Sequence, residues 1–298
     1  MRKGNPSGIT DYGLRGLFLR EITITAITDA VARLCMEANY DLGDDVYQAL
    51  RHGAEHEESP VGREVFGQLI ENAEIARAEL VPMCQDTGFA VVFVELGQDV
   101  HIAGGLLSDA INAGVAKGYT EGYLRKSIVG HPLERKNTGN NTPAVIHTEV
   151  VPGDRLKITI APKGGGSENM SGVRMLKPSD GVEGVKKFVV ELVKAAGSNP
   201  CPPIIIGVGI GGTMDKAAVL SKKALLRRIG DHNPNPSDAE LEKELLRLVN
   251  DTGVGPAGLG GRITALAVNV ETFPCHIASL PVAVTIQCHA ARHKEAVL

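Results

Sequence analysis

Hydrophobic residues recur every three or four positions in several stretches of the chain, which is the period of helices with one buried face. Ile24, Ile27, Val31 and Leu34 show this spacing and predict a helix over residues 22–38. Capping residues support two further helices: Thr120 is a candidate N-cap, and so is Ser237 or Asp238. Including these two, the helices predicted after the first cover residues 61–79, 104–117, 120–129, 182–196, 214–229 and about 238–249.

Runs of β-branched residues between these helices predict strands. "FAVVFVEL" (89–96) has the length and composition of a buried strand. "AVIHTEVV" (144–151) and "RLKITIAP" (155–162) are separated by "PGD" and predict a β-hairpin. Further strands are expected at "IIIGVG", "RITALAVNV" and "VAVTIQ", with Gly-rich loops at 163–169 and 253–261. Together these elements predict an α/β fold with a mixed β-sheet surrounded by helices.

Without an internal repeat or a linker, one domain is expected over residues 22–298, preceded by an N-terminal extension at 1–21. The chain has 298 residues, of which 43% are hydrophobic and 22% charged, so it can bury a sizeable core. Its net charge of −4 gives no reason to expect a nucleic-acid partner. No apolar run approaches the roughly 20 residues of a membrane helix, and "LFL" is too short for a signal-peptide core. A cytoplasmic location is expected.

Five cysteines, an odd number in a long chain, argue against a disulfide framework. Cys84 and Cys201 each follow a helix and precede a strand, and Cys288 ends the last predicted strand, so all three lie where α/β sites gather. Three loop thiolates can hold an iron–sulfur cluster and leave one iron open. Their separations match no local metal motif, so unrelated buried thiols remain an alternative. Cys35 has the helical spacing of a core residue, and Cys275 stays ambiguous.

"GVGIGG", Gly207 to Gly212, has the form of a dinucleotide-binding fingerprint. The acidic residue downstream, Asp231, leads into another helix instead of ending a strand, and no βαβ repeat surrounds the motif. A tight turn facing an anion, or allowing close packing, explains the glycines better. A nicotinamide-dependent dehydrogenase and a scaffolding subunit remain the alternatives from other classes.

Six blocks of sequence together resemble the α component of the iron–sulfur hydro-lyases, namely class I fumarate hydratase and L-tartrate dehydratase. They are "CQDTG", "LRKS", "NTGNNTPA", "KGGGSEN", "CPPIIIGVGIGGTMDKA" and "HIASLPVAVTIQCHA". The resemblance spans nearly all of the chain after about residue 21, and the blocks stand in the family's order. The chain ends soon after "CHAARH", as in the split form of the family, in which a separate β subunit supplies the rest of the active site.

The resemblance implies a [4Fe–4S] cluster held by Cys84, Cys201 and Cys288. Cys275 then lies beside His276, which matches the family's active-site histidine, and six other histidines, among them His289, are expected to be surface or core residues. The residues that match substrate-binding positions are Gln85, Asp86, Arg125, Lys163 and the Gly164–Gly166 loop with Gly165 at its centre.

The chemistry of these residue types agrees with the resemblance. Removing water from a hydroxy acid requires a Lewis acid for the departing hydroxyl and a base for the proton, and we take Asp86 as the candidate base and His276 as the second. Asp86 could instead cap the turn through Thr87 and Gly88. Arg125, expected within the helix 120–129, can bind one substrate carboxylate in a bidentate fork, and Lys163 leads a loop whose N–H groups suit the other.

The sequence therefore predicts the α subunit of an α2β2 hydro-lyase that acts on a dicarboxylate and carries a [4Fe–4S] cluster. Fumarate hydratase of the tricarboxylic acid cycle is the first choice, and L-tartrate dehydratase is the close alternative.

Overall fold

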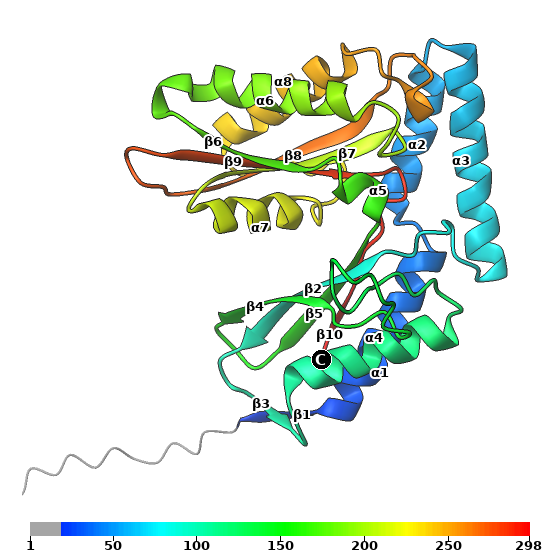
Figure 1. Ribbon diagram of the computed structural model, residues 1–298, viewed down its shortest axis with the longest axis vertical. Coiled ribbons are helices and arrows are strands. Elements are labelled where there is room, and N and C mark those ends of the chain that lie inside the picture. Colours follow the sequence, from blue (N-terminus) through cyan, green and yellow to red (C-terminus); the bar gives the residue numbers. More distant parts are fainter. Residues whose placement is uncertain (1–18) are drawn as a thin grey trace, which may run out of the picture.

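Two four-stranded sheets organise residues 19–298, the part of the chain that this computed structural model describes (Figure 1). Residues 1–18 of the predicted extension lie outside the described part. The last two residues of that extension, Arg20 and Glu21, begin β1 (Arg20–Thr23), which pairs in parallel with β3 (Val100–Ala103).

The first sheet lies in the lower half of Figure 1. Helix α1 (Ile24–Tyr40) packs against it, α4 (Leu107–Glu121) packs on α1, and both contribute to one apolar core. Its strands, in spatial order, are β10 (Lys294–Val297), β5 (Leu156–Lys163), β2 (Phe89–Gly97) and β4 (Val145–Val151). The predicted apolar face of α1 is buried in this core, including Cys35, which is 0% exposed. The prediction that Cys35 is a core residue is confirmed.

The second sheet lies in the upper half, with α6 (Gly181–Ala196) and α8 (Pro236–Asn250) on one face and α7 (Met214–Ala224) on the other (Figure 1). Its strands, in spatial order, are β6 (Gly172–Leu176), β9 (Leu280–Gln287), β7 (Ile204–Gly211) and β8 (Ala265–Phe273). Both sheets contain parallel and antiparallel pairs, so the predicted α/β class with mixed sheet structure is confirmed. Most strands are divided between these two sheets, and β1 and β3 form a third, two-stranded sheet, whereas one sheet was expected.

Two long helices, α2 (Asp44–His56) and α3 (Pro60–Glu79), run side by side along one flank of the molecule, and α5 (Gly165–Glu168) lies near the junction of the two sheets (Figure 1). An apolar cluster joins α2 and α3 to Met83, Ile205 and Ala290. Short 3₁₀ turns occupy Pro178–Asp180 and Pro256–Gly258. Within residues 19–298, no helix is both long enough and apolar enough to span a bilayer.

Several local predictions were wrong. The hairpin 144–162 does not form, because β2 lies between β4 and β5, pairing in parallel with the first and antiparallel with the second. The helix 120–129 does not form either: α4 ends at Glu121, and the Thr120 hydroxyl donates back to the Ala116 carbonyl at 2.8 Å instead of capping a new helix.

Other elements are shorter, longer or new. The predicted helix 214–229 ends at Ala224, and α8 begins at Pro236 with Asn235 as its N-cap, its side chain accepting from the Ser237 N–H. The loop 163–169 contains α5. The elements that no pattern predicted are α2, β1, β3, β6 and β10.

The glycines of "GVGIGG" lie mostly within β7, not in a strand-to-helix turn. A Cβ added at Gly207 would meet the Ser221 carbonyl oxygen at 2.0 Å, and one at Gly209 would meet that of Ala217 at 2.1 Å. The glycines therefore allow α7 to pack directly on the sheet. The expected close packing is present, but most of the motif forms a strand and not the expected tight turn.

Candidate active site

Cys201 and Cys288 lie at the same end of the second sheet. Cys201 comes before β7 and Cys288 directly after β9, and these antiparallel neighbours pair Ile205 with Gln287. Cys84 and Cys288 both contact the apolar cluster that contains Ile205. The structure thus brings the three predicted ligands to one end of the sheet, where the second sheet meets the Cys84 loop.

Two side chains that follow Cys288 link the three cysteine loops. His289 Nδ1 lies 3.0 Å from the Cys201 carbonyl oxygen, a bond in which the ring N–H donates. Arg292 Nη2 donates to the main-chain carbonyl of Asp86, two residues after Cys84. The segment 288–292 therefore holds the other two loops in place, and neither His289 nor Arg292 was assigned a role from the sequence.

Burial and nearby charges act in opposite directions on the cysteine thiols of this region. Burial raises the pKa of the Cys201 and Cys288 thiols, and the charge of Cys84 raises both further. The charges of Arg292 and Lys163 lower the pKa of Cys288. Arg292 is 4% exposed, and its Nε and Nη1 have no hydrogen-bond partner among the described residues, so this buried guanidinium keeps unused donors.

The spacing of the three sulfurs bears on whether the cysteines could bind a single metal ion or an iron–sulfur cluster. Among residues 19–298, Cys84, Cys201 and Cys288 do not form a group whose ligand atoms all lie within 4.8 Å of one another. Sulfurs on one tetrahedral ion, with bonds of about 2.3 Å, would lie roughly 3.8 Å apart. The three sulfurs are therefore too far apart for a single tetrahedral ion as they stand, and their wider spacing is compatible with a [4Fe–4S] cluster in which each cysteine binds a different iron.

Asp86 is held by main-chain donors from two parts of the chain. Its Oδ1 accepts from the Gly88 N–H at 3.1 Å, and its Oδ2 accepts from the Gly165 N–H at 2.8 Å. The first bond is the turn cap considered from the sequence. The second joins Asp86 to the predicted substrate loop, so the carboxylate caps its turn and also lies at the candidate site.

Arg125 lies in an irregular segment, not in the helix that was predicted for it. Thr87 Oγ1 donates to the Arg125 carbonyl at 2.9 Å. Asn141, which is buried, donates to the Gly88 carbonyl at 3.1 Å and accepts from the Ser127 N–H at 2.8 Å. These bonds fix the segment against the turn that carries Asp86, and they leave the Arg125 side chain exposed.

Lys163 is buried, 7% exposed, and belongs to an ion-pair network that the sequence did not reveal. Its Nζ donates to Ser167 Oγ at 2.7 Å and lies 3.5 Å from Glu168 Oε2. Lys222 Nζ, from α7, bonds both oxygens of Glu168 at 2.5 and 2.7 Å. Burial lowers the pKa of Lys163 to about 8.

A pocket of about 400 Å³ collects these groups. This volume lies in the range of small-molecule sites. Its polar lining comes from the predicted Asp86, Arg125, Lys163 and Gly165, together with Glu168, Asn169, Lys222 and Ser127, and its apolar lining from Phe89, Val91, Ile128 and Val145. Glu168 could have been predicted from the sequence, since it lies inside the "KGGGSEN" block. Lys222 could not, because no motif around it indicates a site.

Two predicted site residues lie elsewhere. Gln85 is exposed beside Cys84, whose thiol lies 3.5 Å from Gln85 Oε1, and it does not line this pocket. His276 is exposed in the turn between β8 and β9, with Cys275 beside it. Cys288 is at the opposite end of the 8-residue β9, about 27 Å away at roughly 3.4 Å per residue. Within this chain, His276 and Cys275 are therefore not brought to the cysteine site.

The structure thus places three cysteines near a pocket that contains a fixed carboxylate and several cations, on an α/β fold. The profile of the fumarate hydratase (Fumerase) family matches residues 28–297. The chain therefore belongs to the fumarate hydratase family of hydro-lyases, and the resemblance drawn from its six sequence blocks is confirmed.

Individual relatives agree with this family. A Methanocaldococcus jannaschii protein, provisionally named L(+)-tartrate dehydratase subunit alpha, is 46% identical over 272 residues, which cover 89% of this chain and 95% of that protein. The proteins named L(+)-tartrate dehydratase subunit alpha in Escherichia coli and Shigella boydii are each 34% identical over 276 residues, covering 92% of this chain and 91% of theirs.

Proposed function

We propose that this chain is the α subunit of a hydro-lyase that interconverts fumarate and (S)-malate. The observation that carries the proposal is the position of Asp86. Its carboxylate is fixed by two N–H groups at a pocket lined by Arg125, Lys163 and Lys222, and its own turn begins two residues earlier at Cys84.

The residues of the pocket have distinct tasks in this reaction. Asp86 takes the proton from the carbon next to the hydroxyl-bearing one, and the Gly88 and Gly165 N–H groups keep its carboxylate oriented while it does so. A [4Fe–4S] cluster bound by Cys84, Cys201 and Cys288 would supply an open iron as Lewis acid for the departing hydroxyl.

The charges of the pocket suit a dianion. Arg125 is exposed at its mouth and free to form a bidentate pair with one carboxylate. Glu168 neutralises part of the charge of Lys222 and Lys163, so these lysines provide a moderate field for the second carboxylate, not a tight anion trap. Phe89, Val91 and Ile128 limit water around the carbon skeleton.

L-Tartrate is the second candidate substrate, and the names of the relatives favour it. It differs from malate by one hydroxyl, and a site built to bond that hydroxyl would discriminate strongly. The test is anaerobic turnover of malate and L-tartrate by the same preparation. A preparation that contains iron and sulfide but turns over only L-tartrate would overturn the fumarate assignment and keep the hydro-lyase class.

We further propose a separate β subunit, in an α2β2 assembly, because the relatives are named as alpha subunits. His276 could then act only in the site of a neighbouring chain, since β9 separates it from Cys288 in its own. Co-purification of the two subunits under anaerobic conditions, followed by iron and sulfide analysis, tests the assembly. Cys84→Ala should lose the cluster, whereas Cys275→Ala should keep it.

A further inference from the structure

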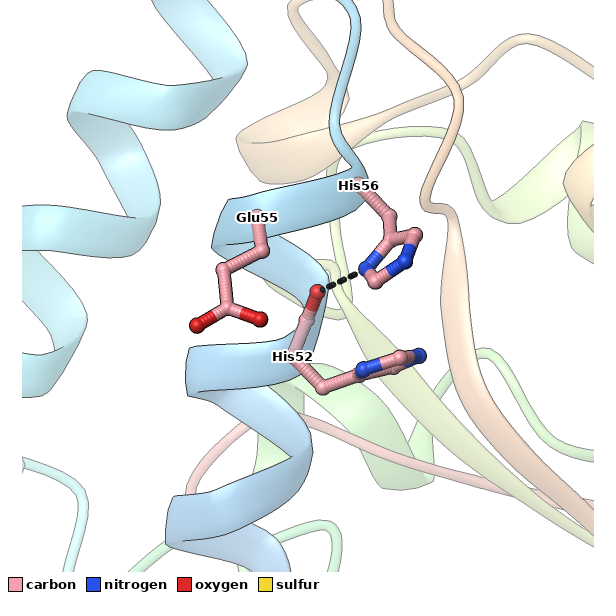
Figure 2. Close-up of side chains that lie close together, drawn as sticks. All are labelled: His52, Glu55 and His56. Atoms are coloured by element: carbon pink, nitrogen blue, oxygen red, sulfur yellow. Dashed lines mark hydrogen bonds between the residues drawn. The ribbon is translucent and has the colours of Figure 1, made fainter.

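Helix α2 carries two histidines and a glutamate in the order H-x-x-E-H: His52, Glu55 and His56. All three are exposed, and one ligand atom from each lies within 4.8 Å of the others. Figure 2 shows the two imidazole rings one helical turn apart on the same side of α2, and their centroids are 4.0 Å apart. The spacing of four residues places the two histidines on one helix face, and Glu55, three residues after His52, lies beside them on the neighbouring face (Figure 2).

The hydrogen bonding of His56 prepares its ring for a metal. Its Nδ1 lies 2.8 Å from the His52 carbonyl oxygen, a bond in which the ring N–H donates (Figure 2). The proton is thereby fixed on Nδ1, and the lone pair of Nε2 is left free. A backbone carbonyl that fixes the tautomer in this way is the usual outer partner of a metal-bound histidine.

The helix that presents these side chains is held firmly at its C-terminal end. Gly53 packs directly on Phe66 of α3, where an added Cβ would lie 2.6 Å from the ring. Glu57, directly after the helix, is 1% exposed, and its carboxylate accepts from the Arg262 and Ile263 N–H groups at 2.8 Å each. A fixed helix lowers the cost of bringing the ligands together.

We propose that His52, His56 and Glu55 form a surface site for a first-row divalent transition metal of the zinc or nickel kind, with water completing the coordination. Imidazole nitrogens suit Zn²⁺, Ni²⁺ and Cu²⁺, whereas Mg²⁺ and Ca²⁺ require oxygen ligands. Nitrogen and oxygen ligands of tetrahedral zinc lie roughly 3.3 Å apart at bonds of about 2.0–2.1 Å. The ligand atoms now lie within 4.8 Å of one another, so metal binding requires these exposed side chains to move closer together. The site is independent of the cysteine site and of the proposed function.

The test is a Ni²⁺ titration of the untagged protein by calorimetry, because an affinity tag would hide the site. The cysteines also bind metals, so the readout is the difference between the protein and the variant His52→Asn/His56→Asn. Loss of both imidazoles should weaken one binding event by about tenfold or more. Glu55→Gln should give a smaller loss, and His232→Asn, which removes a single exposed histidine, should give none.

Thermal melting distinguishes loss of the metal site from poor folding of a variant. Circular dichroism in the presence of a chelator should give the same melting curve for all four proteins, because each substitution is exposed. Ni²⁺ should raise the melting temperature of the unsubstituted protein and of His232→Asn, as a ligand that binds the folded state does. Equal Ni²⁺ binding by His52→Asn/His56→Asn, or an equal melting shift, would overturn the site.

Discussion

Asp86 receives its two N–H bonds from residues 77 positions apart, Gly88 and Gly165, and the second of these belongs to α5. Carboxylate oxygens that accept main-chain N–H groups are well ordered, and this is what a base needs in order to meet one carbon of a bound substrate. The same bonds explain the glycine at position 164, where an added Cβ would lie 3.1 Å from Asp86 Oδ2.

Asp86→Asn should lower kcat for malate dehydration by about 10²- to 10⁴-fold, the typical contribution of a general base. An amide cannot take the proton, and its NH₂ group would face one of the two N–H donors. Iron and sulfide content should stay unchanged, which separates this effect from cluster loss. Asp154→Asn, an exposed turn residue, is the control. Full activity of Asp86→Asn would remove Asp86 as the base.

Lys163 should give the folded protein a specific pH dependence. Burial lowers the pKa of Lys163 from 10.5 to about 8, so between these pH values the unfolded chain binds more protons at this position than the folded chain. Between these pH values the free energy of unfolding therefore rises with pH because of Lys163. Below this window Lys163 is protonated in both states and causes no further change with pH.

In Lys163→Met this contribution should disappear, and the stability difference between the two proteins should shift in favour of the lysine form as the pH rises. Urea unfolding of the cluster-free proteins at several pH values measures the difference. Lys187→Met, at an exposed position, should run parallel to the unsubstituted protein. A parallel course of Lys163→Met as well would contradict the lowered pKa.

At the scale of elements, the glycines of β7 make a prediction with an internal control. Gly209→Ala should destabilise the fold by about 1–3 kcal/mol or more, because the new methyl group meets the Ala217 carbonyl oxygen of α7 at 2.1 Å. Gly67→Ala, in the exposed part of α3 with nothing within 4 Å, should instead stabilise by about 0.5–1 kcal/mol. Chemical denaturation measures the free energy of unfolding of both variants. The same change for both would show that α7 does not pack directly on β7 at Gly209.

Local sequence patterns predicted the helices of this chain better than the order of its strands. The helices at 22–38, 61–79 and 182–196 were predictable, because an amphipathic period is a local property of the chain. The hairpin at 144–162 was not, because the strand that separates its two halves comes from residues 89–97, more than forty positions away. Strand order depends on such distant pairings, and a short turn such as "PGD" does not determine it.

The site residues also fall into two groups, those that sequence motifs predicted and those that only the fold brings to the site. Cys84, Cys201, Cys288, Asp86 and Lys163 lie in recognisable blocks of sequence, so they could be named in advance. Arg125 was placed in the wrong element because its position depends on a bond from Thr87 and on the buried Asn141, not on its neighbours. Lys222 and Arg292 reach the site from α7 and from the segment after β9, and only the folded chain brings them there.

At the scale of the whole molecule, the site lies where the chain passes from one sheet to the other. Residues 288–293 leave β9 in the second sheet and enter β10 in the first, and they carry Cys288, His289 and Arg292. β10 is fixed by its antiparallel pairing with β5 and by the Lys294–Asp41 ion pair at 2.5 Å. Both ends of this segment are therefore anchored, one in each sheet.

Deletion of residues 294–298 should consequently weaken the hold on a cluster, although no cysteine is removed. The first sheet loses its β10 strand, which should lower stability by about 2–5 kcal/mol at roughly 0.5–1.5 kcal/mol per lost hydrogen bond. With one end free, the segment 288–293 no longer holds His289 against Cys201 or Arg292 against Asp86, so iron should be lost faster on exposure to a chelator. Glu295→Gln, which removes only the contact with Lys157, is the matched control and should retain iron normally. If the truncated chain kept its iron as long as this control, the cysteine loops would be organised without the anchor in the first sheet, and the assignment of His289 and Arg292 as the residues that hold them together would fall.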